Sequence, residues 1–383
     1  MVKTKDDIQR EATKIIQSNR ASLLLMGTGT GKTYTALSNM DGKILIVYAA
    51  SPHYQNWLLE IEKWNIQKDI TFTTYDSLHH LIGTKWDWIC LDEAHHCSLL
   101  RLEKLQLIES KKYIYLSATV PKEKLQLLKE LCPYKSYKYN LAESIDSGVL
   151  PQLDIRVINF RLDNTRRDLL YKKEKKTAKS NKVVNYNERF IKSDPLVNIH
   201  IRCTEQEYYN ILCEEMEFWK SKFIQQRLEW QKAKWLRKGG ERKDFLAGLK
   251  TNTAIELVNS LVDKRFIVFT NSIEQCETVA QGYPCVHSKN PDSLTIIDEF
   301  NNGTRDRLFN VRMLNEGMNL TQLDIAIIVA LDGTELSGIQ RIGRSTRSEK
   351  PTIYILRVLN TQDHVYFDKL MSEIKQDYTI YEL

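Results

Sequence analysis

An apolar segment that runs into a glycine-rich loop constrains the fold of this chain more than any other stretch. Residues 23–26 read as a short buried strand, and residues 34–37 are compatible with a helix. Between them lie Gly27, Thr28, Gly29, Thr30, Gly31, Lys32 and Thr33. A strand, a glycine loop and a helix in this order form a phosphate cradle, in which backbone N–H groups close on the phosphates. Lys32 would reach the β- and γ-phosphates, and the Thr33 hydroxyl would bind Mg²⁺.

The loop departs from the usual phosphate-loop pattern at one position. Met26 stands where that pattern has a glycine, six residues before the lysine. Taken alone, the segment could therefore also be a glycine-rich turn without function. The motifs that follow it along the chain favour the nucleotide-binding interpretation.

Composition indicates a protein of two or three domains that does not enter a membrane. The chain has 383 residues, 42% hydrophobic and 27% charged, and no run approaches the ~20 apolar residues of a membrane span. Residues 1–7 lack the apolar core of a signal peptide. Seven cysteines without a C-x-x-C pair argue against a disulfide framework and against a zinc site. We therefore expect a cytoplasmic protein.

Positive charge is concentrated in the middle third of the sequence. The net charge is +6, a mild bias toward polyanions. Residues 166–192 contain ten Lys and Arg against three acids, and a second basic stretch covers residues 220–250. Such a run either contacts phosphates or forms a solvated face, and the sequence leaves both open.

Strands alternate with helices in the first part of the chain. Buried strands are predicted at residues 44–48, 88–91 and 113–116, with helices between them. This alternation predicts a parallel sheet covered by helices on both faces, which binds ligands beyond the carboxyl ends of its strands. Lys32, Asp92 and Ser117 all belong to that edge.

The middle of the chain breaks the alternation, which returns near residue 251. A strand is predicted at 153–160, and Thr204-Glu205-Gln206-Glu207 is a capping box. It opens one long helix to about Lys238, which Gly239-Gly240 should end. We interpret its aromatic residues as packing residues rather than base-stacking platforms: Tyr208, Trp219, Trp230 and Trp235.

The predicted architecture is two α/β domains with a helical, basic insertion between them. Residues 1–150 form the first domain, residues 151–250 the linker and insertion, and residues 251–383 the second domain. Strands at 265–270, 324–331 and 352–358 mark this second domain.

Two further groups of residues suit phosphoryl transfer. Asp92 and Glu93 follow a buried strand, where Asp92 would hold Mg²⁺ and Glu93 would orient and deprotonate a water molecule. A solvated acidic turn is the alternative. Arg344 and Arg347, three residues apart, share one helix face and suit the charge that develops on a γ-phosphate. Their alternative is a basic surface helix.

Together these stretches resemble the motif set of superfamily 2 helicases and translocases. Residues 29–33, 92–95, 117–119, 315–320 and 340–347 resemble, in chain order, motifs I, II, III, V and VI. Asp92-Glu93-Ala94-His95 has the DEAH spelling of motif II. Gln9 stands where this family often has a glutamine that reads adenine, and Gln340 opens motif VI together with the two arginines.

The resemblance implies two RecA-like domains with ATP and Mg²⁺ in the cleft between them. Motifs I and II would come from the first domain, and Arg344 and Arg347 from the second. Ser51-Pro52 with Asn56-Trp57 is similar to the motif Ia region of the Swi/Snf-type branch, which consists largely of double-stranded DNA translocases. The compact size resembles phage-encoded and small bacterial members.

The function that follows is an ATP-dependent helicase or translocase acting on DNA as a monomer or weak associate. An RNA helicase of the same superfamily is one alternative, because the DEAH spelling occurs in both kinds. A motor subunit of a larger complex, such as a restriction system, is the other alternative.

Overall fold

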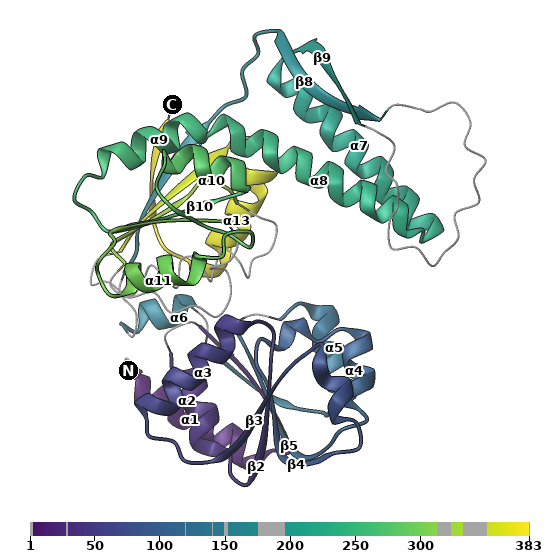
Figure 1. The fold of residues 1–383 in the computed structure, drawn as a ribbon, viewed down its shortest axis with the longest axis vertical. Helices are drawn as coiled ribbons and strands as arrows, with labels where there is room; N and C mark the ends of the chain where they lie inside the picture. The colour runs from purple at the N-terminus through teal and green to yellow at the C-terminus, as the bar shows by residue number, and fades with distance from the viewer. Residues whose placement is uncertain are drawn as a thin grey trace.

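In the computed structural model we describe residues 3–27, 30–118, 120–139, 141–148, 152–174, 196–311, 323–331 and 351–382. These residues form two α/β domains, and a helical arm projects from the second (Figure 1). Among them, no helix is long and apolar enough to cross a membrane.

The first domain is built on a six-stranded sheet in the order β3-β2-β4-β5-β1-β6. All neighbouring strands in it are parallel. In this order β5 separates β1 from β4, and β2 lies on the other side of β4. The strands are β1 (Ala21–Met26), β2 (Lys43–Tyr48), β3 (Asp69–Thr74), β4 (Lys85–Leu91), β5 (Glu109–Ser117) and β6 (Lys135–Tyr139).

Helices cover both faces of this sheet because its central strands are apolar on both sides. Leu24 and Ile46 pack against α1, α2 and α3, whereas their neighbours Leu23 and Leu45 pack on the side of η1, α4 and α5. The helices are α1 (Lys5–Ser18), α2 (Lys32–Asn39), α3 (Ser51–Lys63), η1 (Ser77–Leu81), η2 (Ala94–His96), α4 (Leu99–Leu105) and α5 (Lys122–Leu131).

The second domain contains a seven-stranded sheet in the order β11-β12-β10-β13-β14-β7-β15, again with parallel neighbours. Its strands are β7 (Asp154–Phe160), β10 (Phe266–Thr270), β11 (Cys285–Val286), β12 (Arg307–Val311), β13 (Ile325–Ile328), β14 (Thr352–Val358) and β15 (Tyr378–Glu382). β7 precedes the arm in the sequence, and it pairs with β14, which follows the arm. The arm is therefore an insertion between strands of the same sheet. The strand predicted at 324–331 is shorter than expected.

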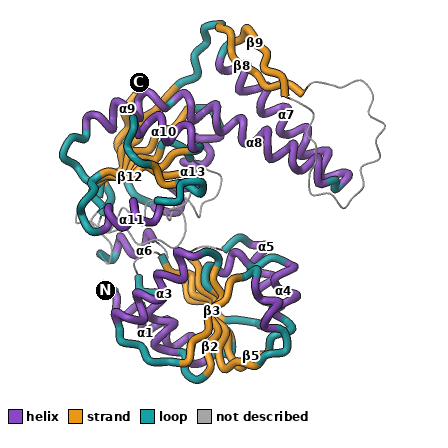
Figure 2. The backbone as a smooth tube through the Cα atoms, in the orientation of Figure 1, coloured by secondary structure: helices purple, strands orange, loops and turns teal. Residues whose placement is uncertain are grey.

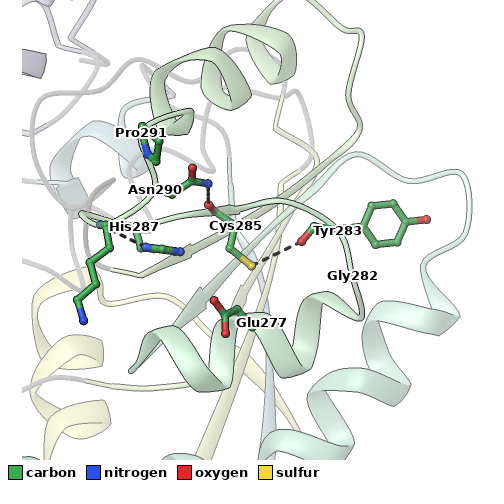
Figure 3. A pocket seen from close by; sticks show the side chains of 8 residues that line it. Glu277, Gly282, Tyr283, Cys285, His287, Asn290 and Pro291 are labelled. Carbon is green, nitrogen blue, oxygen red and sulfur yellow. Dashed lines mark hydrogen bonds between the residues drawn. The ribbon is translucent and has the colours of Figure 1, made fainter.

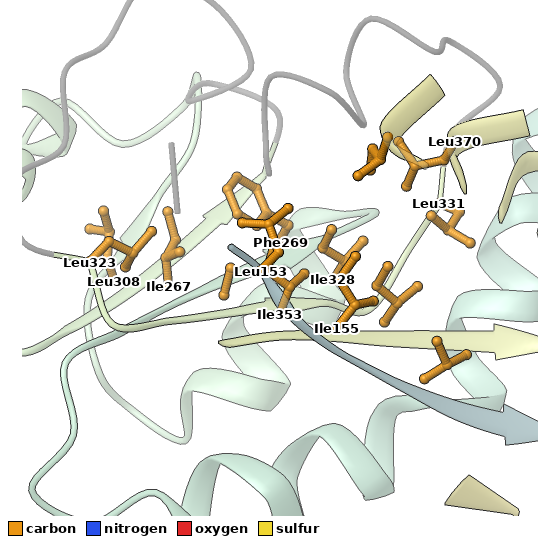
Figure 4. Packing of buried hydrophobic residues seen from close by; sticks show 14 of the residues in the cluster. Leu153, Ile155, Ile267, Phe269, Leu308, Leu323, Ile328, Leu331, Ile353 and Leu370 are labelled. Atoms are coloured by element: carbon orange, nitrogen blue, oxygen red, sulfur yellow. The ribbon is translucent and has the colours of Figure 1, made fainter. Parts of the chain in front are cut away.

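Apolar side chains fill the space between this sheet and the helices on each face. Figure 4 shows the cluster on one face, where Ile155, Ile267 and Phe269 of the strands meet Leu370 of a covering helix. Burying each such side chain contributes about 1.5–3 kcal/mol. The helices on this face are α6 (Leu141–Asp146), α11 (Ser293–Asn301) and α13 (Gln362–Ile374), and those on the other are α9 (Thr251–Ser260) and α10 (Ile273–Ala280). Two α/β domains with parallel sheets, as predicted, are confirmed.

The arm consists of an antiparallel strand pair and two long helices that lie side by side (Figures 1 and 2). Tyr171 and Cys203 of the strands pack on Tyr208 and Leu212 of the first helix. The elements are β8 (Arg167–Glu174), β9 (Leu196–Cys203), α7 (Glu205–Gln226) and α8 (Glu229–Leu249). Most of the basic segment 166–192 lies outside the described residues, so its contact with polyanions stays a prediction.

The prediction of one helix ended by Gly239-Gly240 is wrong. The capping box at Thr204 is present, but α7 ends at Gln226, and Arg227 adopts a φ of 56°. α8 then begins at Glu229 and continues through both glycines to Leu249. Each glycine costs about 1 kcal/mol in a helix, a cost that packing against α7 offsets. Rings on the two helices meet in the pairs Trp219–Trp230, at 5.7 Å, and Phe223–Trp235, at 6.1 Å.

The base of the arm is fixed to the second domain by buried contacts. Lys250, directly after α8, donates to the Asp363 carboxylate at 2.6 Å, and both side chains are buried. The Tyr209 hydroxyl accepts from the backbone N–H of Gln362 at 2.8 Å. Tyr209 also packs with Leu246 of α8 and with Val358 of the second domain. The arm base and this domain therefore form one packed unit.

Candidate functional site

Three neighbouring strands of the first sheet deliver polar residues to one edge. Leu25 of β1 lies in register with Ser117 at the end of β5, and Leu91 of β4 with Tyr115 of β5. Gly27, Asp92 and Ser117 therefore come at or directly after strand ends at the same level. This is the edge at which parallel sheets bind ligands.

The glycine loop turns sharply from β1 into α2. Gly31 has a φ of 89° and precedes α2, which begins at Lys32. A side chain at Gly31 would be strained by this φ and would overlap the Gln9 side-chain amide. Gln9 itself donates to the Thr30 carbonyl oxygen at 3.3 Å, so the glutamine expected to read adenine also contacts the loop. The free N–H groups at the start of α2 are suited to an anion.

Hydrogen bonds with α3, with β2 and with Tyr75 after β3 hold Asp92 in place at the end of β4. The Trp57 indole N–H of α3 donates to Asp92 Oδ2 at 2.8 Å, and the Glu93 backbone N–H donates to Oδ1 at 3.0 Å. The Tyr75 hydroxyl donates to the Asp92 carbonyl oxygen at 3.0 Å, and the Asp92 N–H donates to Val47 O of β2 at 2.8 Å.

Glu93 is linked to the neighbouring strand through a hydroxyl group. Ser117 Oγ donates to Glu93 Oε2 at 3.3 Å, and His95 Nδ1 lies 3.1 Å from Ser117 Oγ and 3.4 Å from Glu93 Oε2. Because the serine proton goes to Glu93, His95 Nδ1–H donates to the serine oxygen. Glu93 has a φ of 47°, a left-handed conformation that turns its side chain out of the strand direction.

Burial and charge act differently on the two carboxyl groups. Burial, and then repulsion by Glu93, raises the pKa of Asp92. Burial acts in the same direction on Glu93, but the Lys32 ammonium and the hydrogen-bonded His95 outweigh it and lower the pKa of Glu93 to about 2. Glu93 is therefore a carboxylate at neutral pH, and Lys32 lies close enough to affect both groups.

The donor set at this edge fits Mg²⁺ bound to a nucleotide. Thr33 in the first turn of α2 offers a hydroxyl oxygen, and Asp92 offers a carboxylate, both ligands that Mg²⁺ accepts. Within the described ranges no group of three or more His, Cys, Asp or Glu residues could hold a metal. Mg²⁺ does not need such a group, because it is usually held by one or two carboxylates together with substrate phosphates.

Several predicted site residues lie outside the described residues. They are Thr28, Gly29, Thr119, residues 315–320, Gln340, Arg344 and Arg347. The structure brings together the remaining ones, from Gly27 and Thr30–Thr33 to Asp92 and Glu93, at the edge of the first sheet, with Gln9 against the loop. The roles assigned to all these residues stay predictions.

Two residues that sequence reasoning did not assign to the site are Trp57 and Tyr75. Both are buried and donate to Asp92. The Asn56-Trp57 pair could have pointed to Trp57, because it lies in the segment similar to motif Ia. One helical turn earlier, the buried His53 accepts the Ala50 N–H through Nδ1 at 3.2 Å. No sequence signal marks Tyr75.

A pocket in the second domain does not belong to this edge. It lies beside β11 and is lined by Glu277, Tyr283, His287 and Asn290 (Figure 3). Asn290 donates to the Cys285 carbonyl oxygen at 2.7 Å, so its amide already has a partner. The pocket contains none of the predicted site residues.

Comparison with known proteins relates the second half of the chain to one family. Residues 249–349 match the family described as the helicase conserved C-terminal domain. No curated protein matches the sequence.

Solved structures share the fold of the whole chain. The ATP-dependent Type ISP restriction-modification enzyme LlaBIII, bound to DNA, is 13% identical, with a TM-score of 0.58 over 100% of this chain and 31% of that one. The chain thus spans about a third of that enzyme. S. cerevisiae Dbp5, bound to RNA and ADP BeF3, is also 13% identical, with a TM-score of 0.60 over 98% of this chain and 89% of that one. The prediction of two RecA-like domains is confirmed at the level of the fold.

The hydrogen bond from Trp57 to the buried Asp92 should contribute to stability. Trp57→Phe keeps a ring in place but leaves Asp92 Oδ2 without its indole donor. We expect a loss of about 1.5–3 kcal/mol, the usual worth of a hydrogen bond to a charged group, measured from urea unfolding of the variant. The loss should be larger at neutral than at acidic pH, because the donor stabilises ionised Asp92.

Trp64→Phe is the matched control. Trp64 also donates to a carboxylate, Glu60 Oε2, at 3.0 Å, but its side chain is 45% exposed. This control should lose less than about 0.5 kcal/mol. Equal losses in the two variants would contradict the importance of the buried contact.

Proposed function

We propose that this chain is a superfamily 2 helicase or translocase, a motor that uses ATP hydrolysis to move along duplex DNA and to remodel or unwind it. The match of residues 249–349 to the helicase conserved C-terminal domain supports the predicted superfamily, and together with the fold it supports a nucleic-acid-dependent ATPase. DNA as the nucleic acid, ATP with Mg²⁺ as the bound group, and the residue roles are the proposal.

The observation that carries the proposal is the buried Asp92–Glu93 pair on the same sheet edge as the glycine loop. The loop backbone and Lys32 would hold the phosphates of ATP, and Thr33 with Asp92 would hold Mg²⁺. Bound Mg²⁺ would withdraw negative charge from the phosphate oxygens. Glu93, ionised at neutral pH, would accept a hydrogen bond from the attacking water and so orient it, while Ser117 and His95 fix its carboxylate.

The second domain would complete the site through Gln340, Arg344 and Arg347. Arginines stabilise the charge that develops on a transferring phosphoryl group when they approach it from a neighbouring domain. The resemblance to motif VI supports this role. Gln9, in contact with the loop, would read the adenine.

Duplex DNA is favoured by the segment similar to the Swi/Snf motif Ia. Its Trp57 is held against Asp92, which links the segment that would meet DNA to the site of hydrolysis. The LlaBIII enzyme of the same fold is bound to DNA, which agrees with this choice. Dbp5, bound to RNA, keeps an RNA helicase as the second candidate. A motor subunit is the third, because this chain spans only 31% of the LlaBIII chain.

The ATPase rate against a panel of nucleic acids tests the choice. We expect duplex DNA to stimulate hydrolysis more than single-stranded DNA or duplex RNA of equal length. Stronger stimulation by RNA would favour the RNA helicase instead. An isolated chain that no nucleic acid stimulates would indicate a motor subunit that needs its complex.

Glu93→Gln should keep nucleotide binding but lose turnover, because only the carboxylate that orients water is changed. We expect kcat to fall by about 10²–10⁴-fold, with the affinity for a fluorescent ATP analogue nearly unchanged. The exposed Glu103→Gln on α4 is the control and should keep its activity. Normal turnover in Glu93→Gln would show that another group orients the water.

Arg344→Ala and Arg347→Ala should each lower kcat on the order of 10³-fold with little change in ATP affinity, because arginines of this kind act mainly in the transition state. Arg305→Ala serves as the control, since this arginine pairs with Glu299 on the same domain. If ATP affinity fell as much as kcat, the arginines would bind the ground state instead.

A further inference from the structure

Charge is distributed unevenly along the arm. We define the outer segment as residues 217–236, where α7 ends and α8 begins, and the inner part as residues 205–216 and 237–249. The outer segment has five Lys and Arg against two acids, a net charge of +3. The inner part has four against six, a net charge of −2. Within the two helices of the arm, the net positive charge therefore lies at the far end.

The cations of the outer segment lie over aromatic rings. Lys234 lies 4.5 Å from the centre of the Trp219 ring and 5.2 Å from that of Trp230. Lys222 lies 5.7 Å from the Phe218 ring and Arg227 5.9 Å from the Phe223 ring. A ring attracts a cation through its quadrupole but carries no net charge. These contacts therefore hold Lys222 and Arg227 in position without neutralising them.

Carboxylates pair with the cations of the inner part. Lys238 is buried between Glu215, at 2.9 Å, and Glu241, at 2.8 Å. Arg237 also lies 3.5 Å from Glu241. In the outer segment the pairs Lys220–Glu217 and Lys232–Glu229, at 3.1 and 3.6 Å, are between partly exposed side chains, where an ion pair contributes little. Of the two helices α7 and α8, the outer segment is thus the part whose net charge is positive.

Large apolar side chains are exposed in the same outer segment. Phe218 and Ile224 are each 53% exposed, Trp230 is 40% exposed, and Leu236 is 60% exposed. Exposed rings next to cations are the combination with which proteins bind nucleic acids, since rings stack on bases or sugars and cations meet phosphates. An acidic protein surface would attract the cations but offers few planar groups on which the aromatic rings could stack.

We propose that the outer segment of the arm is a second binding surface for the nucleic acid on which this motor acts, separate from the motif Ia segment around Trp57. Lys222 and Arg227 would contact phosphates, and Trp230 with Phe218 would pack on sugars or unpaired bases. The proposal rests on the proposed function for the nucleic acid, but not on its being DNA.

Removal of two cations tests the surface. Lys222→Gln with Arg227→Gln keeps the long side chains and removes both charges. At ~0.1 M salt we expect the affinity for a nucleic acid to fall about 10-fold or more, and the slope of log affinity against log salt to flatten by up to about 1.8 for duplex DNA. Hydrolysis without nucleic acid should be unchanged, whereas half-maximal stimulation should need more nucleic acid.

Arg237→Gln with Lys243→Gln is the matched control, because it removes two charges from the inner part of the same helices. It should change affinity and salt slope much less. Trp230→Ala should weaken binding to a single strand, and Trp230→Phe should restore most of it, because a smaller ring still stacks. Circular dichroism of each variant shows whether the helices remain folded.

The outcomes separate this inference from the proposed function. If the outer and control variants bind duplex DNA, single-stranded DNA and RNA equally well, the surface does not bind nucleic acid and faces a protein partner instead. Such a result would leave stimulation of the wild-type ATPase, and hence the proposed function, intact. If the wild type binds only RNA and the outer variant loses that binding, the inference stands and duplex DNA is the wrong substrate.

Discussion

Two adjacent carboxyl groups, Asp92 and Glu93, are buried at the end of β4, and the rest of the first domain is arranged to tolerate them. Like charges in a low-dielectric site repel, so each needs donors or cations nearby. Trp57 of α3 and Ser117 of β5 provide donors, and Lys32 of α2 provides positive charge. One pair of acids therefore fixes the relative positions of several elements around one strand end.

The residues at the edge of the first sheet could be predicted because short stretches of sequence mark the ends of its strands. An apolar run followed by glycines, or by Asp92-Glu93, marks a strand end, and parallel topology brings such ends together. The partner of Asp92 could not be predicted in this way. Trp57 lies 35 residues earlier, and nothing in either segment specifies that their side chains meet. Contacts of this kind depend on how α3 packs over β2 and β4.

In the arm, short stretches of sequence did not predict where the helices end. Its start was visible in the capping box at Thr204, but the break after Gln226 contains neither glycine nor proline. The glycines that were expected to end the helix lie within α8, which packs along α7 through ring pairs such as Phe223–Trp235. The pairing of β7 with β14, and of the C-terminal β15 with β7, joins segments far apart in sequence and has no local signal.

The buried Lys250–Asp363 pair fixes the base of the arm to the second domain, so that the arm moves together with this domain. α8 has 21 residues, which at about 1.5 Å per residue is a rod of roughly 32 Å. Because its near end is fastened to the second domain, any rotation of that domain is amplified along the rod. A turn of about 10° displaces the far end by about 6 Å, more than one nucleotide spacing of about 3.4 Å along a duplex strand. For a given rotation of the domain, the displacement of the far end grows with the length of α8.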